Sequence, residues 1–329
     1  MAPDSNRSRR WSDIIERAAR LRACLFGSFG AEPVTNAYRL LNDSGDGAEG
    51  FTVDAYAGFL VVQVLDSMAL QSAPALVEAL EKILQPRGIV QKLRYQQTER
   101  GRVPGQIVQG ESPPCALGVL ENSVPLEVEL LEGLHTGLFT DMREEHARMR
   151  QLAVGRRVLN TFAYTGAFSV AAALGGATSV TSVDVIARPL DRAKRNFELS
   201  GVETTAHHFV RMEVIEYLQL AKRRGWTFQA IVLDPPTFAT FKSGHWSART
   251  GYKQLLQLAL GVLDPEGLLW AAANTESMPP ERFEQLIGHA LREARRNARV
   301  IALGGLPPDY PTPIDNPQAR YLKVHLLQA

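Results

Sequence analysis

The chain has 329 residues, 45% of them hydrophobic and 22% charged, and a formal net charge of +1. This composition is ordinary for a globular protein with room for two domains. It is less basic than a dedicated nucleic-acid binder, so any contact with nucleic acid must come from local patches. No run of 18 apolar residues and no apolar signal core occur, which argues against a membrane span and predicts a cytoplasmic protein.

Apolar residues recur at helical spacing between Trp11 and Leu25 and predict a helix. This helix belongs to an N-terminal segment, 1–36, that ends in a loop containing glycine and proline. A small α+β domain is predicted over 37–132, with a helix at 72–84 and strands at 51–53, 59–65, 89–94 and 125–130. Within it, the polar stretch 95–114 is predicted to be a long mobile connection.

Strand and helix patterns alternate over 133–329 and predict an α/β domain. Its clearest unit is a strand at Val158-Leu159, a break at Tyr164-Thr165-Gly166, an apolar helix, and a second strand that ends on Asp184. A carboxylate at that place can accept hydrogen bonds from two ribose hydroxyls. Because the turn lacks the G-x-G-x-x-G spacing that a pyrophosphate needs, a cofactor without phosphates and with an amino-acid tail fits better than NAD.

A second feature lies fifty residues further on, where the buried strand pattern Ile231-Val232-Leu233 runs into Asp234-Pro235-Pro236. Two prolines fix φ and donate no backbone hydrogen bond, so the strand must stop there. The chain then carries a carboxylate and the ring of Phe238 toward the glycine turn, where they can hold a flat base by stacking and hydrogen bonding. A strand followed by a merely rigid loop is the alternative.

The chain from about Arg39 onward resembles the bacterial large-subunit ribosomal RNA methyltransferases of the class I S-adenosylmethionine (SAM)-dependent type. That family includes cytosine-C5 enzymes and a related guanine-N7 domain. The matching segments occur in the family's order and are EGFTVDAYAGFLVVQ from Glu49, GLHTGLFTDMRE from Gly133, VLNTFAYTGAFSV from Val158, SVD from Ser182, MEVIEYL from Met212, LDPPTF from Leu233 and GYKQL from Gly251.

The resemblance implies a Rossmann-like class I methyltransferase domain over 133–329, with SAM as cofactor and RNA, most plausibly 23S ribosomal RNA, as partner. An RNA-binding PUA domain normally precedes the family's first helix, and nothing in this sequence corresponds to it. The resemblance also implies which residues hold the cofactor, namely Phe139, Asp141, Arg143, Asn160, Tyr164, Thr165, Gly166, Phe168, Asp184, Val185, Glu213, Val214 and Asp234.

For two of these assignments an alternative stays open. Asp141 and Arg143 can form an ion pair at a helix start that contributes little. Glu213 stands where the family has an aspartate and can accept from the adenine amine, with Val214 packing on the ring, or it can be an exposed acid in a loop.

The residues expected to act on the base are Asp234, Pro235, Pro236, Phe238 and Asn274. Methylation of a pyrimidine C5 needs a thiolate to attack C6 first, and the family's cytosine-C5 members carry that cysteine where this chain has Asn274. Nitrogen methylation is therefore favoured, because a nitrogen acceptor needs positioning and no covalent step. A cytosine-C5 enzyme with another nucleophile, an enzyme acting on a small molecule or another RNA, and a non-catalytic SAM- or RNA-binding factor remain the alternatives.

The remaining polar features support weaker predictions. Cys24 and Cys115 form neither a metal-ligand pattern nor a disulfide framework, so no metal is expected. Tyr252 and Lys253, with Lys242, follow the D-P-P loop and are candidates for substrate contact as well as for plain surface positions. Basic groups that can contact RNA, or can be solvated surface, are Arg7, Arg9 and Arg10; Arg94, Arg100 and Arg102; Lys222 to Arg224; and Leu291 to Arg299.

Overall fold

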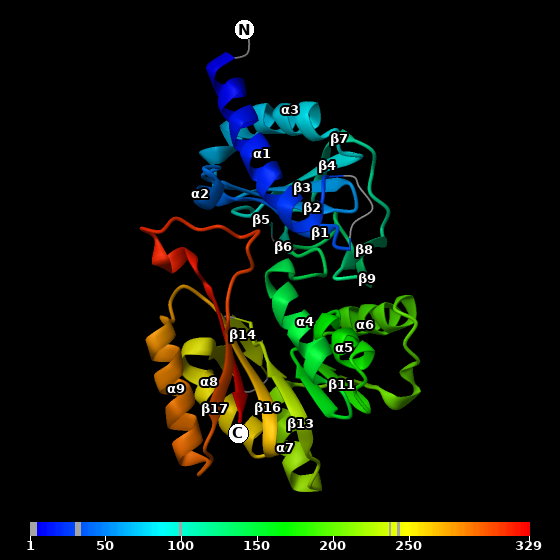
Figure 1. The fold of residues 1–329 in the computed structure, drawn as a ribbon, viewed down its shortest axis with the longest axis vertical. Helices are drawn as coiled ribbons and strands as arrows, with labels where there is room; N and C mark the ends of the chain where they lie inside the picture. Colours follow the sequence, from blue (N-terminus) through cyan, green and yellow to red (C-terminus); the bar gives the residue numbers. More distant parts are fainter. Residues whose placement is uncertain (1–4, 30–33, 99–100, 237, 242–243) are drawn as a thin grey trace. The chain divides into compact units, whose positions relative to one another are not determined.

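The computed structural model describes residues 5–29, 34–98, 101–236, 238–241 and 244–329. The chain forms two compact units (Figure 1). The N-terminal unit comprises residues 1–143 together with a late segment, 307–317, and the C-terminal unit comprises 144–306 and 318–329. The predicted domain boundaries after residues 36 and 132 stay a prediction. Within the described ranges, no helix is both long enough and apolar enough to cross a membrane.

The N-terminal unit is built on a five-stranded sheet in the order β1-β2-β3-β4-β7, in which only β3 and β4 run parallel. The buried side chains of α1 (Ser5–Phe26) and α3 (Ala73–Leu84) share one hydrophobic cluster with those of the sheet. The sheet strands are β1 (Ala37–Asn42), β2 (Phe51–Tyr56), β3 (Phe59–Val64), β4 (Gly88–Leu93) and β7 (Gln106–Gly110). The small α+β fold predicted here is confirmed.

The shorter elements of this unit lie around that sheet. They are α2 (Asp43–Asp46), the 3-10 helices η1 (Ala69–Ser72) and η2 (Thr140–Met142), and the hairpins β5–β6 (Gln97–Thr98, Gly101–Arg102) and β8–β9 (Leu117–Glu121, Val124–Val128). The prediction of a long mobile connection over 95–114 was wrong, because β7 within it pairs with β4. Since β7 is an edge strand whose side chains are all exposed or half-buried, its sequence lacks the apolar alternation that reveals a strand.

A buried ion-pair network ties the late segment into this unit. The carboxylate of Asp309 is fully buried and accepts hydrogen bonds from Nη1 and Nη2 of Arg143, at 3.2 and 2.5 Å, and from the backbone N–H of Arg39 at 2.9 Å. Its backbone carbonyl accepts from Arg22 at 2.7 Å, and the same guanidinium donates twice to Asp46, at 2.7 and 2.8 Å. One carboxylate thus joins three chain segments far apart in sequence.

The C-terminal unit is a seven-stranded sheet in the order β12-β11-β10-β13-β16-β18-β17. The first five of these strands are parallel, and β18 runs antiparallel to both of its neighbours. The strands are β10 (Arg157–Thr161), β11 (Ser179–Asp184), β12 (His208–Arg211), β13 (Phe228–Leu233), β16 (Leu263–Asn274), β17 (Arg299–Gly304) and β18 (Leu322–Gln328). This topology confirms the predicted Rossmann-like fold.

Helices cover both faces of this sheet. One large hydrophobic cluster packs residues of α7 (Val214–Arg224), α8 (Ala248–Leu260) and α9 (Pro280–Glu293) against inward side chains such as Leu159. The next residue, Asn160, points to the other face and bonds to Ser169 of α5 (Ala167–Leu174), since neighbouring strand residues face opposite ways. The unit also contains α6 (Ala187–Leu199), the 3-10 helix η3 (Thr204–Ala206) and the hairpin β14–β15 (Phe238–Phe241, Gly244–Ser247). Except for their first residues, α4 (Arg143–Leu152) and the 3-10 helix η4 (Pro317–Ala319) belong to it as well.

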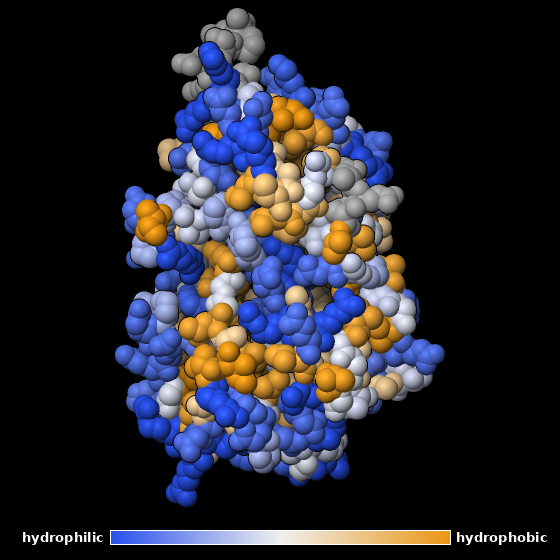
Figure 2. Space-filling view, viewed as in Figure 1, coloured by the Kyte–Doolittle hydropathy of each residue, from blue (hydrophilic) through white to orange (hydrophobic). Residues whose placement is uncertain are grey.

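The outermost strand, β17, carries exposed apolar side chains. Val300 is 56% exposed and Leu303 62% exposed. Figure 2 shows apolar surface in the region where Figure 1 draws this strand. An edge strand of this kind is available for pairing with another chain.

Replacement of Asp309 by alanine tests the buried network. We expect Asp309→Ala to lower the free energy of unfolding by about 3–5 kcal/mol, because it leaves the guanidinium of Arg143 buried without its carboxylate. Urea unfolding measures this change. Asp315→Ala, an exposed aspartate of the same late segment, is the matched control and is expected to change stability by less than about 0.5 kcal/mol. Equal urea midpoints for Asp309→Ala and Asp315→Ala would contradict a stabilising role for the ion pair between Asp309 and Arg143.

Candidate functional site

Five parallel strands of the C-terminal unit end at one edge of its sheet. They end at Thr161, Asp184, Arg211, Leu233 and Asn274. The order of the strands reverses between β10 and β13, which are neighbours in the sheet but far apart in sequence. Ligands of open α/β sheets bind beyond the carboxyl ends of the strands at such a reversal. Ten of the predicted site residues lie at or just beyond these strand ends: Tyr164, Thr165, Gly166, Asp184, Val185, Glu213, Asp234, Pro235, Pro236 and Asn274.

The turn after β10 has an unusual backbone. Phe162 and Tyr164 have φ of 53° and 48°, and Gly166 has φ of 78°. Positive φ is costly for residues other than glycine and concentrates at functional sites. At Gly166 glycine is also required for space, because a Cβ there would lie 2.8 Å from the Cβ of Ala193 on α6. The chain therefore turns sharply, and α5 begins directly behind the turn.

Asp184 fixes this turn from the neighbouring strand. Its Oδ2 accepts the backbone N–H of Tyr164 at 2.9 Å, and its Oδ1 accepts that of Ile186 at 2.9 Å. A carboxylate has about four acceptor positions, so two remain for the hydroxyls of a ribose. Val185 and Ile186 follow with 48% and 58% of their surface exposed, which leaves an apolar surface that a flat ring can cover. These residues fit the nucleoside part of SAM.

Three other predicted residues of this region are buried in the wall behind the turn. The amide of Asn160 donates to the hydroxyl of Ser169 at 2.9 Å. The backbone carbonyl of Thr165 accepts from the amide of Asn196 at 2.8 Å. The ring of Phe168 is 7% exposed and lies 4.5 Å from the ring of His146. Asn160 thus supports the turn from behind through a hydrogen bond, and Phe168 does so through ring packing.

Glu213 stands between β12 and α7, next to the strand end at Arg211. It is the N-cap residue of α7 and only 9% exposed. The alternative of an exposed acid in a loop is therefore wrong. Val214, the first residue of α7, is 3% exposed and belongs to the hydrophobic cluster, so its side chain is largely committed to the core.

The D-P-P loop lies across the reversal point from the glycine turn. Asp234 is half-buried, Pro235 is buried and Pro236 is exposed. Phe238 is the first residue of β14, but its side chain, like residue Thr237 as a whole, lies outside what the structure describes. Asn274 ends β16 and pairs with Leu322 of β18.

Tyr252 contacts the ends of the two strands, β13 and β16, that lead to the expected base site. It is fully buried on α8, and its hydroxyl lies 2.8 Å from the carbonyl oxygen of Ala272 and 3.3 Å from that of Leu233. Burial raises its pKa well above 10, and the nearby charge of Asp234 adds to this rise, so the hydroxyl keeps its proton and acts as a donor. The prediction of substrate contact or a surface position for Tyr252 was wrong. Its signal in the sequence, an aromatic residue on the apolar face of α8, is shared with ordinary core residues.

The physical reason for this contact is the pair of prolines. Strands β13 and β16 pair as far as Leu233 and Ala271, and Pro235 and Pro236 offer no N–H that could continue the ladder. Tyr252 supplies a hydroxyl proton at the point where the strands part, one residue before Asp234 and two before Asn274. We infer that it sets the spacing between these two side chains.

Phe139, Asp141 and Arg143 belong to the N-terminal unit, unlike the other predicted residues. Phe139 precedes η2 and lies 5.1 Å, ring to ring, from His135, and Asp141 is buried within η2. Arg143 bonds to Asp309, as described above. Their assignment to the cofactor stays a prediction.

The predicted basic patches divide between the units. Lys222 to Arg224 end α7 and Arg296 follows α9, so both lie at the amino edge of the C-terminal sheet, opposite the strand ends that carry the site. Arg9 and Arg10 are exposed on α1, while Arg94 is half-buried. Lys253 pairs with Glu293. Lys242 and Arg100 lie outside the described residues, as do the side chains of Arg7 and Arg102.

Among the described residues, no cluster of His, Cys, Asp and Glu that could hold a metal ion occurs.

Known proteins that are similar to this chain include methyltransferases. A family model described as S-adenosylmethionine-dependent methyltransferase matches residues 44–327. The chain is 35% identical over 316 residues to YwbD of Bacillus subtilis, covering 95% of this chain and 79% of YwbD. It is 35% identical over 291 residues to the ribosomal RNA large subunit methyltransferase I of Serratia proteamaculans, covering 88% of this chain and 73% of that protein. The crystal structure of SMU.776 complexed with SAH superimposes with a TM-score of 0.90 at 29% identity, covering 98% of this chain and 82% of that one.

Two variants test the cofactor part of the site. We expect Asp184→Ala and Gly166→Val to abolish binding of SAM in calorimetry, the first by removing the ribose acceptor and the second by forcing a side chain into Ala193. Asp191→Ala, an exposed aspartate on α6, is the control and is expected to bind like the unmutated protein. Absence of SAM binding by the unmutated protein would contradict the assignment of this site.

The role of Tyr252 is tested by removal of its hydroxyl alone. Tyr252→Phe keeps the ring contact with Phe283, at 5.2 Å, but loses the bond to Ala272. We expect kcat for methyl transfer to fall about tenfold or more while the Kd for SAM stays unchanged, because small misplacements of reacting groups are costly. Tyr217→Phe removes a hydroxyl from the same hydrophobic cluster and is the matched control. If Tyr252→Phe and Tyr217→Phe lose kcat equally and in proportion to their loss of melting temperature, the role of Tyr252 is purely structural.

Proposed function

The chain belongs to the S-adenosylmethionine-dependent methyltransferase family, and we propose that it methylates a nitrogen of a base in 23S ribosomal RNA. Its cofactor is S-adenosylmethionine and its reaction is methyl transfer. The observation that carries the proposal is the position of Asp234 and Asn274 at neighbouring strand ends, across the reversal point from the glycine turn and Asp184. The cofactor and a flat acceptor can thus share one edge of the sheet.

Ribosomal RNA as the substrate is supported by the relatives. The Serratia proteamaculans protein is named a ribosomal RNA large subunit methyltransferase, and this chain matches nearly three quarters of its length at 35% identity. Lys222 to Arg224 lie at the amino edge of the sheet, so they supply no positive charge near the proposed site. RNA must therefore be held by other surfaces.

Nitrogen as the acceptor atom is supported by the distribution of cysteines. The chain has two cysteines, Cys24 and Cys115, both within the N-terminal unit and both exposed. None occurs in the part of the sequence that folds into the C-terminal unit, where the D-P-P loop lies. Methyl transfer to a pyrimidine C5 needs a thiolate beside the base, whereas transfer to nitrogen does not. The position held by Asn274 suits a hydrogen bond to the edge of a base.

The residues of the site then have separate tasks. SAM supplies an electrophilic methyl group bound to sulfur. The oxygens of Asp184 hold the ribose, and the turn through Gly166 lets the backbone approach the amino-acid tail. Asp234 accepts a hydrogen bond from the N–H of the base and takes its proton as the nitrogen gains the methyl group. The amide of Asn274 bonds to a second atom of the base edge, so the acceptor is oriented before it reacts.

Mass-spectrometric mapping of 23S ribosomal RNA with and without the gene tests the substrate and the atom together. We expect one methylated base to disappear on deletion, with the methyl group on nitrogen, and to return when the gene is restored. A gene encoding Asp234→Ala should not restore it. An unchanged methylation map would contradict ribosomal RNA as the substrate, and loss of a C5-methylated pyrimidine would contradict the nitrogen assignment.

Cysteine variants give a second test of the acceptor atom. Cys115→Ser and Cys24→Ser are expected to leave the methylation rate unchanged within about twofold, because neither thiol takes part in transfer to nitrogen. The rate is measured with labelled SAM and ribosomal RNA. A covalent adduct between RNA and either cysteine would overturn the proposal.

A further inference from the structure

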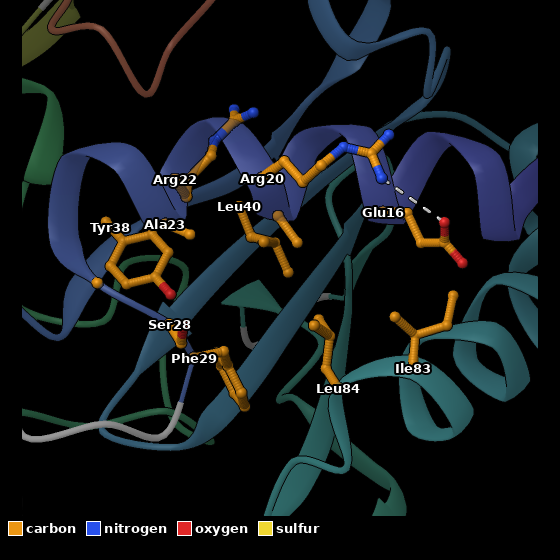
Figure 3. A pocket seen from close by; sticks show the side chains of 12 residues that line it. Glu16, Arg20, Arg22, Ala23, Ser28, Phe29, Tyr38, Leu40, Ile83 and Leu84 are labelled. Carbon is orange, nitrogen blue, oxygen red and sulfur yellow. Dashed lines mark ion pairs between the residues drawn. The ribbon is translucent and has the colours of Figure 1, made fainter.

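A pocket of about 430 Å³ lies within the N-terminal unit (Figure 3). Its volume is in the range of small-molecule sites. Four segments line it: α1, the turn that follows α1, β1 and the end of α3. The side chains that matter for what it can hold are Glu16, Arg20, Phe29, Tyr38, Leu40 and Leu84. None of these residues belongs to the methyl-transfer site described above.

The inner surface of the pocket is apolar and partly aromatic. Leu40 is 1% exposed, and Leu84, at the end of α3, is half-buried. The ring of Tyr38 is stacked on Phe26 with 4.8 Å between the centroids and 26° between the planes. Phe29 is half-buried on the same side of Figure 3 as Tyr38. A flat ring can pack against this lining.

The hydroxyl of Tyr38 is the distinctive polar group of the pocket. The residue is only 5% exposed, yet its hydroxyl makes no hydrogen bond to any residue that the structure describes. Figure 3 shows it directed toward the cavity. Burial raises the pKa of Tyr38 to about 12, so the group keeps its proton and can donate. The hydroxyl oxygen is not among the described side-chain atoms that are both fully buried and without a hydrogen-bond partner, so it faces the open space of the pocket, where it can donate to a ligand atom.

The two arginines of the pocket play different parts. Arg22 is 1% exposed, and its guanidinium is bound to Asp46, Arg39 and Asp309, so it forms a fixed wall. Arg20 is 72% exposed at the side chain, and its contact with Glu16, at 3.7 Å, is a surface ion pair of little strength. Its guanidinium can therefore turn to an anion at the rim. A ligand with a flat, hydrogen-bond-accepting ring and a neighbouring negative charge fits these features.

We propose that this pocket binds an unstacked base of single-stranded RNA, with the Tyr38 hydroxyl donating to the base and Arg20 contacting the adjacent phosphate. The proposal rests on the proposed function, since it assumes an RNA substrate. Single-stranded RNA is commonly held by bases stacked on aromatic side chains with basic residues along the backbone. The α1 helix is rich in arginine, with six against two acidic residues over Ser5–Phe26, which suits a nucleic-acid strand passing over it.

Fluorescence anisotropy with labelled single-stranded oligoadenylate and oligouridylate tests the proposal on the full chain. We expect Tyr38→Phe to raise the Kd about threefold to tenfold, because one hydrogen bond is lost. Leu84→Trp, which fills the pocket, is expected to raise it about tenfold or more. Arg20→Ala is expected to weaken binding and to reduce its dependence on salt.

Matched variants in the same unit serve as controls. Tyr95→Phe alters a half-buried tyrosine outside the pocket, and Arg87→Ala removes an exposed arginine bound to Glu111. Both are expected to leave the Kd within about twofold of the unmutated protein. An unchanged Kd for Tyr38→Phe and Leu84→Trp, with unaltered melting temperatures, would overturn the proposal that RNA binds in this pocket. If the protein methylates 23S RNA but these variants bind RNA normally, only the pocket proposal fails. If it methylates no RNA, the proposed function fails first.

Discussion

The strand order of the C-terminal unit reverses between β10 and β13, and the proposed site depends on this reversal. Helices that follow the two strands cover opposite faces of the sheet, and in open α/β sheets the loops at such a reversal separate and leave room for a ligand. The turn through Gly166 and the carboxylate of Asp184 lie on one side of the reversal point, and Asp234 lies on the other. Sheet topology alone thus brings together groups about fifty residues apart in sequence.

Backbone groups at the strand ends that have no hydrogen-bond partner in the sheet are the second constraint on the proposed site. Pro235 and Pro236 end β13 without donating, and Asp184 and Tyr252 supply the contacts that order the loops on either side. These polar groups hold loops at the carboxyl ends of central strands such as β10 and β13, whose side chains are mostly buried. Rigid positioning of reacting groups is what methyl transfer to nitrogen requires, since no covalent intermediate helps to hold the base.

The sequence was sufficient to predict the Rossmann-like fold and the cofactor, because strand ends, glycine turns and prolines leave local patterns. It did not reveal Asp309, since an aspartate in a proline-rich stretch looks like a surface loop until the structure places it against Arg22 and Arg143. The sequence named Tyr252 as a candidate for substrate contact or a surface position and did not reveal its buried hydrogen bond, because its helical spacing is shared with ordinary core residues. The strand β7 lacked a pattern, since only one neighbour pairs with it.

A crystal structure of the protein with SAH bound is the most direct test of the proposed site. We expect both ribose hydroxyls of SAH to bond to the carboxylate of Asp184, the amino-acid tail to follow the turn at Gly166, and the sulfur to face the side of the reversal point where Asp234 and Asn274 lie. SAH bound elsewhere in the protein, or bound with its ribose away from Asp184, would contradict it.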